Sequence, residues 1–131
     1  MQNKSCPFCQ IASDIGHPDI LLHNTFGFVV RDRTPVTSGH SLVVLKRHVA
    51  SFFDISHDER LALFALLDLA KVNIDAEHQP DTFNIGINDG PAAGQTLPHL
   101  HIHLIPRYAE AGVDARGVRW IVPETAAYVN E

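Results

Sequence analysis

Leu97–Arg107 reads LPHLHIHLIPR, and this stretch of the sequence decides the fold. Histidines alternate in it with aliphatic residues. Successive side chains of a β-strand point to opposite faces, so the alternation predicts a strand over His99–Ile105 with one face in the core. The other face carries His99, His101 and His103 in a row of about 13 Å, from a rise of roughly 3.3 Å per residue.

A row of three imidazoles predicts a chemical site, because imidazole titrates near neutral pH. Such a group can act as a nucleophile, carry a proton or bind a metal ion. Two other interpretations stay open at this point. The histidines could be polar residues on a solvated strand face, or they could form a pure metal site, since His-x-His on a strand can chelate zinc.

The segment before the histidines is a loop rich in small residues, Asn88–Thr96, with the sequence NDGPAAGQT. Small residues let backbone N–H groups approach a phosphate closely. Gln95 and Thr96 would add side-chain donors at the end of the loop, and Asn88 could bond a ribose or phosphate oxygen at its start. Taken alone, such a loop is also consistent with an ordinary turn.

The rest of the chain predicts three further strands and one long helix. Ser56 and Glu59 form a capping-box pattern at the start of a helix that runs from His57 to about Gln79. Its apolar residues are too many for one narrow stripe, so we expect the helix to be well covered. The predicted strands are Phe26–Arg31, Ser41–Lys46 and Phe83–Asn88. Strands, then a helix, then strands indicate an α+β fold.

Length and composition favour one globular domain over residues 1–131. The chain has 131 residues with no internal repeat and a formal net charge of −5, which disfavours a nucleic-acid groove. It contains no targeting segment and no apolar run long enough to cross a membrane, so we expect a cytoplasmic protein without membrane partners.

The two cysteines form a separate motif, Cys6-Pro-Phe-Cys9. This spacing is too short to staple distant parts of a fold and is typical of a metal or redox pair. Two thiolates supply half of a tetrahedral zinc site. The alternatives are an empty pair of reduced thiols and a redox pair, the latter disfavoured because no thioredoxin-like βαβ pattern surrounds it.

Together these motifs resemble the histidine triad family of nucleotide hydrolases and transferases. The resemblance rests on the histidine row with its preceding loop, on Asp32-Arg-Thr-Pro35 and on Gly39-His40-Ser-Leu-Val-Val, and it covers roughly Cys6 to Arg107. It implies the histidine triad fold, in which an antiparallel sheet of about five strands packs on a long helix. It also implies a homodimer formed through that helix and an edge strand.

The resemblance implies a role for each matching residue. His101 would attack the α-phosphorus of a purine nucleotide and become nucleotidylated before water releases the monophosphate. His103, with Gln95 and Thr96, would bind the phosphoryl oxygens. The substrate-binding positions would be Asp32 at the ribose hydroxyls, His40 supporting the hydrogen bonds of the histidine row, and Arg33 and Asn88 as further contacts.

Zinc is the cofactor that the resemblance implies. Some members of the family, and the related galactose-1-phosphate uridylyltransferases, hold zinc on a Cys-x-x-Cys pair, a histidine after the second strand and the first histidine of the row. Those positions are Cys6, Cys9, His48 and His99. No magnesium motif is visible.

Four functions therefore remain as hypotheses. DGPAAGQT and LIPR are similar to the branch that hydrolyses diadenosine polyphosphates, which we rank first. A purine nucleoside phosphoramidase would use the same machinery on another leaving group. A zinc-stapled nucleotide-binding or regulatory module would bind without turnover, and a metal-dependent hydrolase would use all three histidines as ligands. The segment Tyr108–Gly117 is predicted to be a loop, either closing over the nucleotide or lying on the surface.

Overall fold

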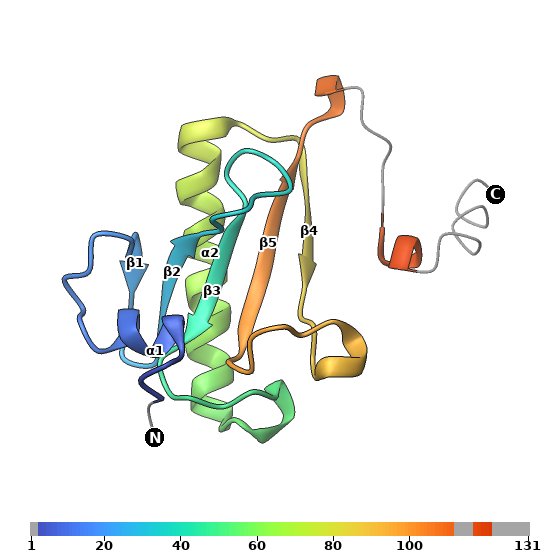
Figure 1. The fold of residues 1–131 in the computed structure, drawn as a ribbon. Coiled ribbons are helices and arrows are strands. Elements are labelled where there is room, and N and C mark those ends of the chain that lie inside the picture. Colours follow the sequence, from blue (N-terminus) through green and yellow to red (C-terminus); the bar gives the residue numbers. More distant parts are fainter. Residues whose placement is uncertain (1–2, 112–116, 122–131) are drawn as a thin grey trace.

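A computed structural model describes residues 3–111 and 117–121 and shows a five-stranded antiparallel sheet (Figure 1). The strand order is β1-β2-β3-β5-β4, so β5 is inserted between β3 and β4. The strands are β1 (Leu22–His23), β2 (Gly27–Arg31), β3 (Ser41–Leu45), β4 (Thr82–Gly86) and β5 (His101–Arg107). With its single long helix, this architecture confirms the α+β prediction.

The helices lie on opposite faces of the sheet (Figure 1). The long helix α2 (His57–His78) begins with the predicted capping box, in which Ser56 Oγ accepts the Glu59 N–H and the Glu59 side chain accepts the Ser56 N–H. It ends at Gln79, whose φ of 54° is left-handed. The shorter elements are α1 (Pro7–Ala12) and the 3₁₀ turns η1 (Phe52–Asp54), η2 (Pro91–Ala93), η3 (Ala109–Ala111) and η4 (Val118–Ile121).

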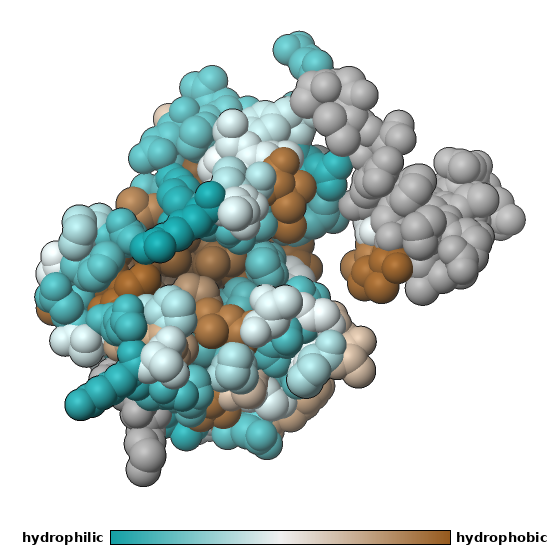
Figure 2. Space-filling model, in the orientation of Figure 1, coloured by the Kyte–Doolittle hydropathy of each residue, from teal (hydrophilic) through white to brown (hydrophobic). Residues whose placement is uncertain are grey.

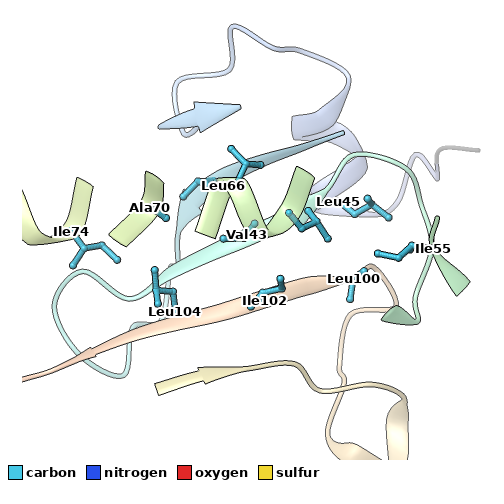
Figure 3. Packing of buried hydrophobic residues seen from close by; sticks show 11 residues of the cluster. Val43, Leu45, Ile55, Leu66, Ala70, Ile74, Leu100, Ile102 and Leu104 are labelled. Carbon is cyan, nitrogen blue, oxygen red and sulfur yellow. The ribbon is translucent and has the colours of Figure 1, made fainter. Parts of the chain in front are cut away.

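The main core lies between α2 and the sheet (Figure 3). The aliphatic residues that alternate with the histidines, Leu100, Ile102 and Leu104, are all buried in it. They meet Val43 and Leu45 of β3 and a row of α2 side chains, Leu63, Leu66, Ala70 and Ile74. One face of the histidine segment is therefore core, as its alternation predicts.

A second buried cluster covers the opposite face of the sheet. It combines Phe8 and Ile11 of α1 with Val30, Leu42 and Val44 of β2 and β3. The strand register pairs Val44 with His101 and Leu42 with His103, and directly paired residues share a face. The histidines therefore lie on the α1 side of the sheet.

Three boundaries differ from the sequence prediction. β5 begins at His101 instead of His99, because Leu100 leaves the ladder and donates its N–H to the Val49 carbonyl. It continues to Arg107, which pairs with Thr82, so β4 is Thr82–Gly86 and not Phe83–Asn88. The sequence also gave no sign of α1 or of the two-residue β1. Residues 112–116 of the predicted loop lie outside the described residues.

The prediction that α2 is well covered is wrong for the isolated chain. Four large apolar side chains on its outer surface are exposed by 46% to 65%: Leu61, Phe64, Leu69 and Val72. Only one stripe of the helix faces the sheet, and no described element covers the other side. Within the described residues, no helix has both the length and the apolar character needed to cross a membrane.

A buried carboxylate ties the start of α2 to the segment after β3. Glu59 is 4% exposed and accepts two hydrogen bonds from Arg47, at 3.0 Å to Nε and 2.7 Å to Nη2. These bonds are the largest cause that lowers the pKa of Glu59 from 4.5 to about 2. The pairing fixes the backbone next to His48.

Replacing Glu59 with Gln is expected to lower the free energy of unfolding by about 2 kcal/mol at pH 7, because charge-assisted hydrogen bonds to Arg47 are lost. A lowered carboxyl pKa stabilises the fold above the unfolded pKa, and this contribution is lost as pH falls from 4.5 toward 2. The two proteins should therefore converge in urea unfolding at pH 3. The exposed Lys71–Asp75 pair supplies the control, and Asp75→Asn should change stability by less than about 0.5 kcal/mol. Equal effects of the two substitutions would contradict the prediction.

Candidate functional site

His101 stands at the start of β5 with one ring nitrogen fixed by the backbone. Its Nδ1 lies 2.8 Å from the carbonyl oxygen of His99. A carbonyl can only accept, so Nδ1 carries the proton and Nε2 keeps its lone pair. Phe8 and His103 pack against the ring, with centroids at 5.2 and 5.0 Å. A neutral imidazole held in this way can act as a nucleophile through Nε2.

A chain of hydrogen bonds fixes the proton of His103. The Val36 N–H donates to Nδ1 of His40 at 3.1 Å, so the proton of neutral His40 is on Nε2. That atom lies 3.0 Å from Nδ1 of His103 and 3.4 Å from Oδ2 of Asp32. With Nδ1 of His103 accepting, its own proton must be on Nε2. His103 is thereby set as a donor for an anionic oxygen.

Burial keeps both of these histidines neutral at pH 7. Desolvation is the main cause that lowers the pKa of His103 to about 4, and the nearby His101 and His40 lower it further. The pKa of His40 is also lowered by burial, although the Asp32 carboxylate opposes the shift. The site is therefore an array of neutral donors and acceptors and not a patch of positive charge.

These shifts predict how stability depends on pH. A histidine whose folded pKa lies below its unfolded value of 6.5 binds fewer protons in the folded state, so its contribution is complete above pH 6.5 and falls as the pH drops toward 4. Urea unfolding between pH 7.5 and 4.5 should show a steeper loss for the native chain than for His103→Gln. The exposed His23 is the control, because His23→Gln should follow the native curve. Parallel curves for all three proteins would contradict the assignment.

A cavity of about 420 Å³ opens beside this site on the α1 face. Its apolar walls include Phe8 and Ile11 of α1, Val30 of β2 and Leu42 of β3, and Asp32 stands at its polar side. Figure 2 shows hydrophobic surface in the middle of this face, over β2 and β3. An apolar slot with one carboxylate suits a flat ring that carries hydroxyl groups.

Sequence reasoning missed the walls of this cavity. The available signal was the spacing of Phe8 and Ile11, which places both on one side of a helical turn. His17, which matched no motif, also lines the cavity. The wall residues come from three separate segments, and only the fold brings them together.

The other predicted substrate contacts are spread around the site. Arg33 lines the cavity, but its side chain is 84% exposed and lies 3.4 Å from Asp19. Asn88 is exposed and lines a second cavity, of about 290 Å³, together with His40 and His103. His40 itself is 3% exposed and lies behind His103, so it is placed to orient that side chain.

Gln95 is engaged in holding the loop. Its Oε1 accepts the Gly90 N–H at 2.8 Å and its Nε2 donates to the Ala50 carbonyl at 3.0 Å. The side chain thus closes the loop on itself and ties it to the segment after β3. Thr96 is exposed at the end of the same loop. A phosphate contact remains a prediction for both residues, with only one N–H of the Gln95 amide uncommitted.

The four predicted zinc ligands come together at the other end of the histidine row. One potential ligand atom from each of Cys6, Cys9, His48 and His99 lies within 4.8 Å of every other. Nδ1 of His99 is 3.3 Å from Cys6 Sγ and 3.2 Å from Nδ1 of His48, which is 3.2 Å from Cys9 Sγ. Tetrahedral zinc separates such atoms by about 3.4 to 3.8 Å. The cluster matches a tetrahedral site to within a few tenths of an ångström.

The environment of the cluster also fits a metal ion. His99 is fully buried and donates its Nε2–H to the Leu45 carbonyl, which leaves Nδ1 unprotonated. Burial lowers the pKa of His99 to about 4 and raises the pKa of the Cys9 thiol. A neutral imidazole is ready to bind, and a cation would stabilise the buried thiolates. Within the described residues, no metal-ligating cluster includes His101, which disfavours a hydrolase that uses all three histidines as ligands.

Comparisons with known proteins agree with this geometry. The HIT domain family model matches residues 17–110. A bis(5'-adenosyl)-triphosphatase of Saccharomyces cerevisiae is 34% identical over 90 residues, which are 68% of this chain and 44% of the yeast protein. This chain thus matches less than half the length of that relative. An uncharacterised 16.1 kDa HIT-like protein of Mycoplasma pneumoniae is 30% identical over 82% of this chain and 75% of its own.

A solved structure links the fold to the metal. A Zn-bound histidine triad family protein from Mycobacterium smegmatis superposes with a TM-score of 0.74 and 30% identity, covering 86% of this chain and 82% of that one. The family model matches well over half of the 131 residues, and the histidine row lies within the match. The chain therefore belongs to the HIT, or histidine triad, family of nucleotide hydrolases and transferases.

Proposed function

We propose that the protein cleaves the α-phosphate bond of a purine nucleotide, with diadenosine polyphosphates as the preferred substrates, through a nucleotidyl intermediate on His101. The observation that carries the proposal is the hydrogen bond from Nδ1 of His101 to the His99 carbonyl. It leaves Nε2 free on the face that also bears the apolar cavity. The yeast triphosphatase supports the substrate class.

In the first step, Nε2 of His101 attacks the α-phosphorus. A nitrogen–phosphorus bond forms while the bond from phosphorus to the bridging oxygen breaks, and the remaining nucleotide leaves with that oxygen. The base lies between α1 and the sheet, and Asp32 accepts hydrogen bonds from the ribose hydroxyls. The Nε2–H of His103 donates to a phosphoryl oxygen as negative charge develops there.

In the second step, water attacks the same phosphorus from the side that the leaving group has vacated. The nitrogen–phosphorus bond breaks, water supplies the new oxygen, and nucleoside monophosphate and neutral His101 are regenerated. Two displacements through a good nucleophile replace one difficult displacement by water. The His99 carbonyl favours the same Nδ1–H tautomer before and after the reaction.

Zinc on Cys6, Cys9, His48 and His99 would supply structural rigidity and no reacting group. The His99 side chain belongs to this cluster, and its carbonyl accepts the proton of His101. One residue thus connects the ligand set with the nucleophile. The metal would act on the reaction only through this positioning.

The test is the intact mass of the protein after brief mixing with substrate. Diadenosine tetraphosphate and adenosine phosphoramidate are mixed separately with the native chain and with His101→Gly, in a quenched time course. A transient gain of one adenylyl group that requires His101 supports the covalent route, and the substrate with the faster turnover identifies the branch. Nucleotide binding without adduct or turnover on either substrate would leave a zinc-stapled binding module as the function.

The phosphoramidase alternative rests on a specific observation. The second cavity, beside His103 and Asn88, is the space for a leaving group, and it is bordered by Gly117 and Val118. Its wall thus includes residues close to the end of the described structure. Leaving-group preference is accordingly the part of the proposal that the two-substrate comparison decides.

We also propose that the protein works as a homodimer. The outer surface of α2 carries four exposed apolar side chains, and Ile85 of the edge strand β4 is 57% exposed. An exposed strand edge next to an apolar helix face favours pairing with a second copy. Leu69→Asp should convert a dimer to a monomer in sedimentation velocity, whereas Lys71→Asp on the same helix should not. A native chain that sediments as a monomer at micromolar concentration would contradict the proposal.

A further inference from the structure

The short helix α1 contributes side chains to two separate sites. Cys6, its N-cap residue, and Cys9 in its first turn both belong to the ligand cluster. Phe8 and Ile11 line the nucleoside cavity. The thiols and the cavity wall thus belong to one six-residue element, and a change in the position of α1 changes both sites.

Phe8 makes this connection at the level of side chains. Its ring lies 5.5 Å from the ring of His99 and 5.2 Å from the ring of His101, edge-on in both cases. It is 9% exposed and also forms part of the cavity wall. One aromatic side chain therefore touches a ligand of the metal cluster, the nucleophile and the space for the base.

Little besides these contacts holds α1 in place. Helices this short are not stable on their own in water, and the N-cap makes no side-chain hydrogen bond to the first turn. The helix packs on β2 and β3 through the second apolar cluster, to which the two cysteines also belong. Fixing two of its side chains to His48 and His99 would restrict the whole wall of the cavity.

We propose that α1 couples metal occupancy to nucleoside binding, so that a zinc ion in the cluster and a base in the cavity stabilise each other. The inference rests on the proposed nucleotide function, because it takes the cavity as the site of the base. A metal that orders α1 removes part of the entropy cost of binding the base. Linkage requires the effect to be reciprocal, with the same factor for each ligand.

The experiment measures zinc affinity with and without nucleotide. The dissociation constant for zinc is determined on the full chain by competition with a chromogenic chelator, in the absence and presence of saturating adenosine monophosphate. Calorimetry gives the affinity for the nucleotide in the zinc-loaded and zinc-depleted forms. We expect each ligand to tighten the other by about tenfold, within the usual range of allosteric coupling.

Two matched variants separate α1 from the rest of the cavity. Ile11 and Leu42 are 8% and 7% exposed and line opposite walls, Ile11 on α1 and Leu42 on β3. Ile11→Ala removes a contact between the base and α1, so the coupling factor should shrink toward one. Leu42→Ala should weaken nucleotide binding equally in both metal states and leave the factor unchanged. If zinc removal unfolds the chain, the difference between these two factors still decides, because unfolding would raise both alike.

Two results would overturn the inference alone. One is a zinc affinity that does not change with nucleotide while calorimetry shows the nucleotide bound. The other is an equal coupling factor in Ile11→Ala and Leu42→Ala. Failure of the nucleotide to bind in either metal state would instead remove the proposed nucleoside site, and the inference with it. The His101-dependent adduct tests the catalytic proposal independently of all these outcomes.

Discussion

His101→Ala is expected to lower kcat/KM on a diadenosine polyphosphate by about 10⁴-fold or more. The substitution removes the only group that forms a bond to phosphorus, and the remaining site can stabilise only direct attack by water. Hydrolysis is followed by separating the mononucleotide products. Affinity for adenosine monophosphate should change less than about threefold, because the cavity walls lie elsewhere.

A substantial residual rate in this variant would show that the nucleophile is another group. A residual rate that disappears only when His103 is also replaced would point to that residue. Loss of both catalysis and nucleotide binding would indicate local unfolding, which the circular dichroism and thermal midpoint of His101→Ala would reveal. The kinetic prediction is therefore separable from damage to the fold.

Cys9→Ser is expected to lose bound zinc and to lower the midpoint of thermal unfolding by at least about 10 °C, since structural zinc contributes many kcal/mol to small domains. Metal content is measured on purified protein by mass spectrometry, and unfolding by calorimetry. Chelation of the native chain should lower its midpoint toward that of the variant. His23→Ala, at an exposed histidine outside the cluster, should retain both metal and stability.

The contrary result would relocate the metal. Zinc that survives Cys9→Ser but disappears in His101→Ala would belong to the histidine row, and the hypothesis of a metal-dependent hydrolase would replace the covalent one. The structure places Nδ1 of His99 among the thiols and Nδ1 of His101 on a carbonyl. We therefore expect metal content to follow the cysteines.

Periodic segments could be predicted from the sequence because each has its own local signal. The capping box at Ser56 and Glu59 located the start of α2, and alternation identified the buried side of β5. The boundaries of β4 and β5 could not be predicted, because they depend on pairing between distant residues. Leu100 shows this well, since its N–H bonds to Val49 instead of continuing the ladder.

The candidate site divides in the same way. The ligand set Cys6, Cys9, His48 and His99 could be predicted from motif spacing and family resemblance, and the structure brings those side chains together. The apolar wall formed by Phe8 and Leu42 could not, because ordinary hydrophobic residues carry no mark of the ligand they face. The engagement of Gln95 with Gly90 and Ala50 was also invisible, since it depends on the shape of a loop.

The place of β5 in the sheet has a consequence for biosynthesis. Of the described strands it is the last in sequence, yet it lies between β3 and β4. While the chain is being synthesised, β4 has no partner within the sheet and the first two thiols wait for His99, made 90 residues after Cys9. Long-range pairing of this kind delays folding. The nascent chain should therefore stay open until the histidine segment leaves the ribosome, and zinc insertion should be among the final steps of maturation.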